Sequence, residues 1–76
     1  MDVWSTYLET LEALLNERDP GWMVFNLADE VAQFKPADGF WMTITGVELR
    51  AEGTPEAAVD YIIARAQEEL AELEDE

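Results

Sequence analysis

The amino-acid sequence predicts a small α+β domain in which a helix, about three antiparallel strands and a second helix follow one another. Apolar residues near both ends of the chain recur at spacings of three and four, which is the period of an amphipathic helix. The middle of the chain alternates apolar and polar residues and is rich in β-branched and aromatic side chains, as strands are. Because 76 residues can bury little more than one hydrophobic core, we expect a single domain over residues 1–76.

The first helix is expected over residues 3–17. Pro20 cannot continue a helix and Gly21 permits a turn, so the helix should end shortly before them. Its apolar stripe consists of Trp4, Leu8, Leu11, Leu14 and Leu15.

The strands are expected within residues 22–52. Phe40, Met42 and Ile44 alternate with Trp41, Thr43 and Thr45, and these β-branched and aromatic residues predict one strand there. Gly46 is expected to form a turn or bulge before another short strand, Val47 to Ala51.

The segment from Trp22 to Phe34 has two interpretations. Its first residues, Trp22 to Leu27, have the composition of a strand. However, Leu27, Val31 and Phe34 also recur at i, i+4 and i+7, which would make residues 27–34 a short helix. We prefer the strand.

The last helix is expected over residues 54–73, followed by an acidic tail over residues 74–76. Thr54 is a suitable N-cap and Pro55 is favoured at the first helical position. Its apolar stripe consists of Val59, Ile62, Ile63, Ala66, Leu70 and Leu73.

The composition argues against an enzyme. The chain has no His and no Cys, so it lacks the commonest general base and the thiolate metal ligands. Ser5 is the only serine, and the sequence contains neither a phosphate-binding loop nor an EF-hand pattern. We therefore expect no catalytic residues, no metal and no cofactor. With no signal peptide and no apolar run of membrane-spanning length, the expected location is the cytoplasm.

The charge points to a protein partner. Eighteen Asp and Glu residues oppose four Lys and Arg, giving a formal net charge of −14. A small domain designed only for solubility carries a net charge of magnitude about 2 to 8. Clustered cations for phosphate groups are missing, so neither nucleic acid nor a membrane is expected to bind directly. A basic protein surface is the expected partner.

Candidate partner-binding residues are carboxylates and two tryptophans. Like charges at four-residue spacing repel one another, and negative charge at a helix C-terminus opposes the helix dipole, so stability alone does not explain the acidic end of the last helix. The alternative is a solvated surface without a partner. The carboxylates are Glu56, Asp60, Glu68, Glu69 and Glu72 in the last helix, Glu9 and Glu12 in the first, and Asp29 and Glu30 in the middle. The apolar candidates are Trp22 and Trp41, for which the alternative is a place in the core.

The element order resembles that of the double-stranded-RNA-binding domain. "GFWMTITGVELRAEGTPEAAVDYIIARAQEEL" is similar to the strand, strand, helix half of that family. Its members place lysines at the start of the last helix, but Thr54 to Ala58 contain none here, so the resemblance does not imply RNA binding. "GVELRAEGTPEAAV" also resembles the strand-to-helix junction of HicB-type antitoxins.

A short, single-domain and very acidic chain resembles small phage-encoded inhibitors, including anti-CRISPR proteins and other DNA mimics, in its size and charge and not in a sequence motif. Such a resemblance implies that the chain blocks a basic surface on a nucleic-acid-binding protein or complex, in the host cytoplasm. Two alternatives remain open at this point. One is a self-associating structural or accessory module, such as a homodimer, and the other is an antitoxin-like regulatory subunit.

Overall fold

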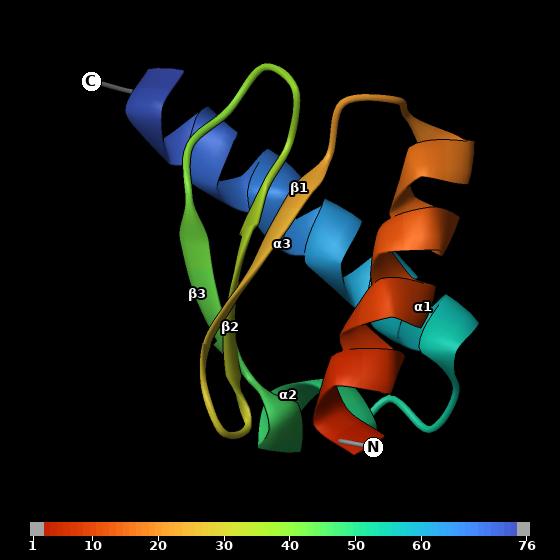
Figure 1. Ribbon diagram of the computed structural model, residues 1–76. Helices are drawn as coiled ribbons and strands as arrows, with labels where there is room; N and C mark the ends of the chain where they lie inside the picture. Colours follow the sequence, from red (N-terminus) through yellow and green to blue (C-terminus); the bar gives the residue numbers. More distant parts are fainter. Residues whose placement is uncertain (1–2, 75–76) are drawn as a thin grey trace.

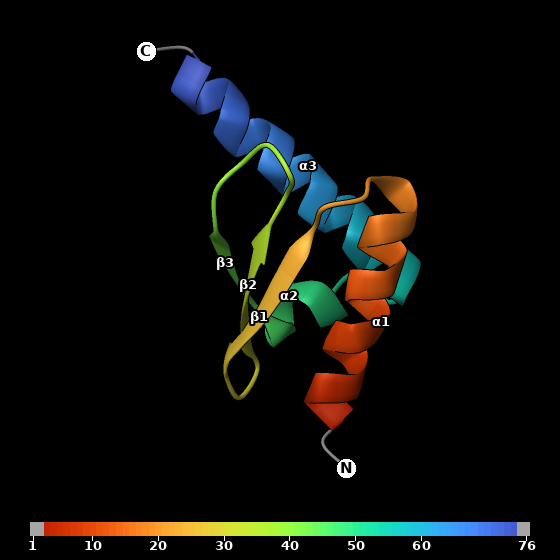
Figure 2. The ribbon, with the colours of Figure 1, turned by 45° about the horizontal axis from the view of Figure 1, so that its top comes forward.

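The computed structural model describes the backbone of residues 3–74 and the side chains of residues 3–72. Its strands form one antiparallel sheet in the order β1-β2-β3, and the long helices cover one face of that sheet (Figures 1 and 2). This arrangement confirms the predicted α+β fold. The elements are α1 (Val3–Arg18), β1 (Met23–Ala28), β2 (Val31–Lys35), β3 (Met42–Thr45), α2 (Gly46–Arg50) and α3 (Pro55–Glu74).

Helix α1 extends one residue beyond the predicted range and then turns sharply into β1. The turn is held by Asn16, whose Oδ1 accepts a hydrogen bond from the backbone N–H of Gly21 at 2.9 Å. Gly21 has a φ of +113°, a conformation that residues with a Cβ rarely adopt. The same Asn16 donates through Nδ2 to the carbonyl of Trp22 at 3.3 Å, so one side chain fixes both the end of α1 and the start of β1.

Strands β1 and β2 form a hairpin over the segment that had two interpretations. Phe25 pairs with Gln33, Asn26 pairs with Ala32, and the register shifts between Asn26 and Ala28. The strand interpretation of Trp22 to Leu27 is confirmed, and the short helix over residues 27–34 is wrong. The sequence does not indicate this turn, because Glu30, with a φ of +63°, occupies a position where Gly or Asn is usual.

The strand predicted from Val47 to Ala51 is also wrong, because these residues lie in and just after α2. Thr45 caps this helix: its backbone is extended, and its Oγ1 accepts a hydrogen bond from the N–H of Glu48 at 3.3 Å. Leu49 is fully buried while Val47 is 75% exposed. The apparent alternation therefore comes from a single helical turn that buries one leucine.

Helix α3 begins as predicted. Pro55 is its first residue, and the Oγ1 of Thr54 accepts a hydrogen bond from the N–H of Ala57 at 3.2 Å. The helix continues to Glu74, so the predicted acidic tail starts inside it, and residues 75–76 lie outside the described part. Its C-terminal half extends beyond the sheet (Figure 2).

The core lies between the sheet and the helices. Trp4 also joins α1 to β1, because its Nε1 donates to Oδ1 of Asn26 at 3.1 Å. The largest fully buried side chains come from five elements and are Leu11, Leu15, Phe34, Ile44, Leu49, Val59 and Ile62.

Replacing Gly46 with Ala should destabilise the protein. A Cβ at this position would collide with Oε2 of Glu30 and lie 3.1 Å from the Trp4 ring. We expect Gly46→Ala to lower the free energy of unfolding by about 1 to 2 kcal/mol in urea titrations, because overpacking exceeds the gain in helix propensity. In a Glu30→Ala background, where one obstacle is gone, the same substitution should cost less. Wild-type stability of Gly46→Ala would contradict the close packing described.

Candidate functional site

The three arginines are engaged in ion pairs within the chain. Each pair is partly exposed, so solvent screens it and its contribution to stability is small. The pairs nevertheless connect helices to one another and to the hairpin turn. The hydrogen bond with the Glu30 carboxylate raises the pKa of Arg50. Each arginine of the described structure therefore has a carboxylate partner within the chain. The pairs are Arg18–Asp60 (2.7 Å), Arg65–Glu48 (2.7 Å) and Arg50–Glu30.

The carboxylates predicted on α3 do not form one face. Asp60 is bound to Arg18. Glu56 and Glu72 are sixteen residues apart, which at 3.6 residues per turn separates them by about 160° around the helix. Glu68 and Glu72 are four residues apart and therefore only about 40° apart around the helix. These two side chains form a short column that Glu56 does not extend.

The other predicted carboxylates lie on separate parts of the molecule. Glu9 and Glu12 border a shallow groove of about 200 Å³ between α1 and β1. Asp29 is exposed in the β1–β2 turn, where its neighbour Glu30 is bound to Arg50. Glu69 lies beside a different groove, described below. The predicted carboxylates, all of which lie in the described part of the chain, are thus spread over the surface and not collected into a DNA-like array.

The sheet face that points away from the helices exposes several large apolar side chains. Ala32, Phe34, Met42 and Ile44 are buried, so the alternate residues of each strand lie on the opposite side. There Phe25 is 52% exposed and Trp41 is 41% exposed. We call this surface the outer sheet face; it consists of Met23, Phe25, Leu27, Val31, Gln33, Lys35, Trp41, Thr43 and Thr45.

The outer sheet face contains no carboxylate. Within the strands that the structure describes there is no Asp or Glu, although 18 of the 76 residues are acidic. Lys35 carries the one charge on this face, and its Nζ donates to the carbonyl of Pro36 at 3.4 Å. Sequence reasoning found Trp41 here but missed Met23, Phe25 and Leu27. The signal was present in "MVFNLA", which is apolar on both faces of a strand.

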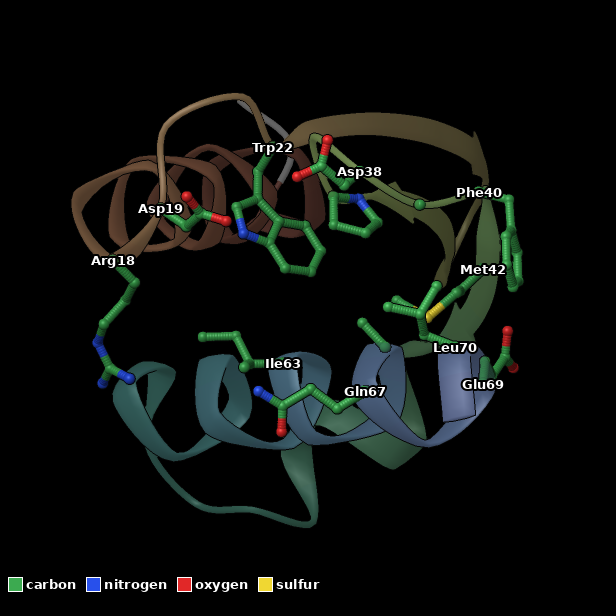
Figure 3. Close-up of a pocket in the computed structure, with 13 residues that line it drawn as sticks. Arg18, Asp19, Trp22, Asp38, Phe40, Met42, Ile63, Gln67, Glu69 and Leu70 are labelled. Atoms are coloured by element: carbon green, nitrogen blue, oxygen red, sulfur yellow. The ribbon is translucent and has the colours of Figure 1, made fainter. Parts of the chain in front are cut away.

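The other tryptophan candidate, Trp22, is only 5% exposed and lines a groove instead. We call this hollow of about 320 Å³, between α3 and the loop joining β2 to β3, the Trp22 groove (Figure 3). Its walls are mainly apolar, and carboxylates stand at its edge. The lining includes Trp22, Pro36, Phe40, Met42, Ile63, Ala66 and Leu70, with Asp19, Asp38 and Glu69 beside them.

One polar atom in the Trp22 groove has no partner. The indole Nε1 of Trp22 is buried and has no hydrogen-bond acceptor among the described residues. In Figure 3 this nitrogen lies on the side of the indole where Asp19 stands. Buried N–H groups are nearly always hydrogen-bonded, so this donor distinguishes the groove from an ordinary surface hollow.

No protein-family model, curated protein or solved structure matches the chain. Among the described helices, none has the length and apolar character needed to cross a membrane. The side chains of residues 3–72 also include no group of three or more carboxylates placed to hold a metal ion.

Phe25 and Phe34 lie on opposite faces of the sheet and provide a matched test of exposure. We expect Phe25→Thr to change the free energy of unfolding by no more than about 0.5 kcal/mol, because surface substitutions rarely do more. Phe34→Thr should cost about 3 kcal/mol or more, because it opens a cavity in the core. Urea titration of both variants measures the difference. Equal losses would mean that the outer sheet face is covered in the folded protein.

Proposed function

We propose that the chain is an acidic protein-binding domain whose outer sheet face docks on a basic surface of a partner. The observation that carries the proposal is an apolar face without carboxylates in a chain of net charge −14. Folded monomers seldom expose large contiguous apolar patches unless these bind something. The centres of protein interfaces are poor in charged residues and rich in aromatic residues and Met, and Met23, Phe25 and Trp41 match that composition.

The charge around this face supports a basic partner. Asp29 and Asp38 stand in the turns at opposite ends of the sheet, and the arginines are occupied within the chain. Negative charges around the face accelerate its encounter with a positively charged protein surface and disfavour acidic partners. The apolar contact then supplies most of the affinity, and the carboxylates select the partner.

Nucleic-acid-binding proteins are the partners that fit this chemistry best, because clustered Lys and Arg are what their binding sites share. A domain docked on such a site excludes the nucleic acid. The proposed function is therefore inhibition by occlusion, of the kind that phage-encoded inhibitors perform. It differs from DNA mimicry, since an apolar contact and not a row of carboxylates anchors the complex.

The same face favours one second candidate, self-association. Two copies meeting through their outer sheet faces would bring no carboxylates into direct contact, so a homodimer is compatible with the high charge. Sedimentation at several protein concentrations separates the candidates. A chain that stays monomeric at every concentration excludes the homodimer, and a concentration-dependent dimer abolished by Phe25→Thr favours it over the inhibitor.

Removing two aromatic side chains from the outer sheet face should abolish partner binding. We expect Phe25→Thr combined with Trp41→Thr to reduce capture of lysate proteins on the immobilised chain by about tenfold or more, since interface hot spots are worth 2 kcal/mol or more. Val47→Thr is the matched control, because Val47 is an exposed apolar residue on α2. Raising the salt concentration should weaken capture by the wild-type chain.

Each captured protein is then tested for binding to double-stranded DNA or RNA, with and without the chain. The proposal expects the chain to displace the nucleic acid. Capture that is unchanged in the double variant, or that leaves nucleic-acid binding intact, would refute it.

A further inference from the structure

We propose that the Trp22 groove binds a peptide segment of the partner that has a large apolar side chain flanked by Lys or Arg. This inference takes the basic character of the partner from the proposed function. It concerns a separate site, however, because the groove lies between α3 and the β2–β3 loop, whereas the outer sheet face points away from the helices.

The shape and lining of the groove suit an apolar side chain. Its volume of about 320 Å³ is at the lower end of the range of ligand pockets, about 300 to 1,000 Å³. Trp22 and Met42 are buried at its floor, while Phe40 and Leu70 remain partly exposed at its sides. Entry of a Leu or Phe side chain would remove these apolar surfaces from water, which is the main source of affinity in such sites.

The charges at the edge of the groove favour a cation. Asp19, Asp38 and Glu69 line it, and their carboxylates make no hydrogen bond or ion pair with any described residue. Arg18 also stands at the edge, but it is bound to Asp60 of α3 at 2.7 Å. Lys and Arg can lay their methylene groups along an apolar wall and hold their charge at its edge, so basic residues beside the apolar anchor complement this groove.

The unpartnered indole supplies the second, independent observation. Trp22 is more than nine-tenths buried, and its Nε1 has no acceptor. In Figure 3 the nitrogen and the Asp19 carboxylate are on the same side of the groove. A backbone carbonyl of a bound peptide can accept this hydrogen bond after a small movement of the surrounding side chains. A peptide therefore matches the groove in three respects: the apolar walls, the acidic edge and the free donor.

The test follows the indole N–H signals of the ¹⁵N-labelled chain by NMR, with the Trp22 signal assigned through Trp22→Phe. Three synthetic peptides are compared: one with Leu-Phe between basic residues, one with the same basic residues around Ser-Ser, and one with Leu-Phe between acidic residues. We expect only the first peptide to move the Trp22 signal in a saturable manner. If no peptide moves it, or the acidic peptide moves it equally, the proposal fails.

Four variants locate the binding site. Leu70→Ser, and Asp38→Asn combined with Glu69→Gln, should each weaken the first peptide about tenfold. Glu56→Gln on the same helix and Leu27→Ser on the outer sheet face are the matched controls and should leave the affinity unchanged. Loss of binding in Leu27→Ser but not in Leu70→Ser would overturn the groove proposal and leave the proposed function standing. Loss of peptide binding in Leu70→Ser, together with lysate capture that is unchanged when Phe25 and Trp41 are replaced, would support the groove proposal and refute the proposed function.

Discussion

The packing of α1 and α3 against one face of the three-stranded sheet is the contact on which the rest of the structure depends. It buries Phe34 and Ile44 of the sheet against Leu11 and Ile62 of the helices. Among residues 3–74 no further element covers the opposite face, so the outer sheet face is open in the described structure. The Trp22 groove has a related origin, because α3 extends past the sheet and only the β2–β3 loop approaches its C-terminal half (Figure 2).

The charge distribution follows from the same layering. Carboxylates occupy the exposed sides of the helices and the turns. The strands pack against the core on one side, carry apolar and uncharged polar side chains with one lysine on the other, and contain no carboxylate. The arginines link α1 to α3, α2 to α3, and α2 to the hairpin turn, which offsets part of the repulsion inside a strongly acidic molecule. The arginines thus link elements of the fold, and the exposed surface is left with uncompensated carboxylates and with an outer sheet face that has none.

The sequence predicted the elements whose signals are long or strong, and missed those decided by one or two residues. Both long helices were evident from the 3.6-residue period, and Thr54 and Pro55 marked where α3 begins. Five residues are too few to show a period, so α2 was taken for a strand; the informative signal was Thr45 with Glu48 three residues later, a capping box. Glu30 in a left-handed conformation concealed the hairpin turn. The alternation of residues in the sequence allowed an outward position for Trp41 as one of two alternatives. The Trp22 groove could not be predicted, because it brings together residues from α1, the β2–β3 loop and α3, which no local sequence pattern relates to one another.

The central claim is that a partner contacts the outer sheet face. Site-specific photo-crosslinking tests it most directly, with a photoreactive amino acid placed at Phe25, at Trp41 or at Val47 in otherwise unchanged chains. The account predicts that the first two positions crosslink to a nucleic-acid-binding protein and that Val47, on α2, does not. Crosslinks from Val47 alone, or none from Phe25 and Trp41 while the partner is bound, would contradict it.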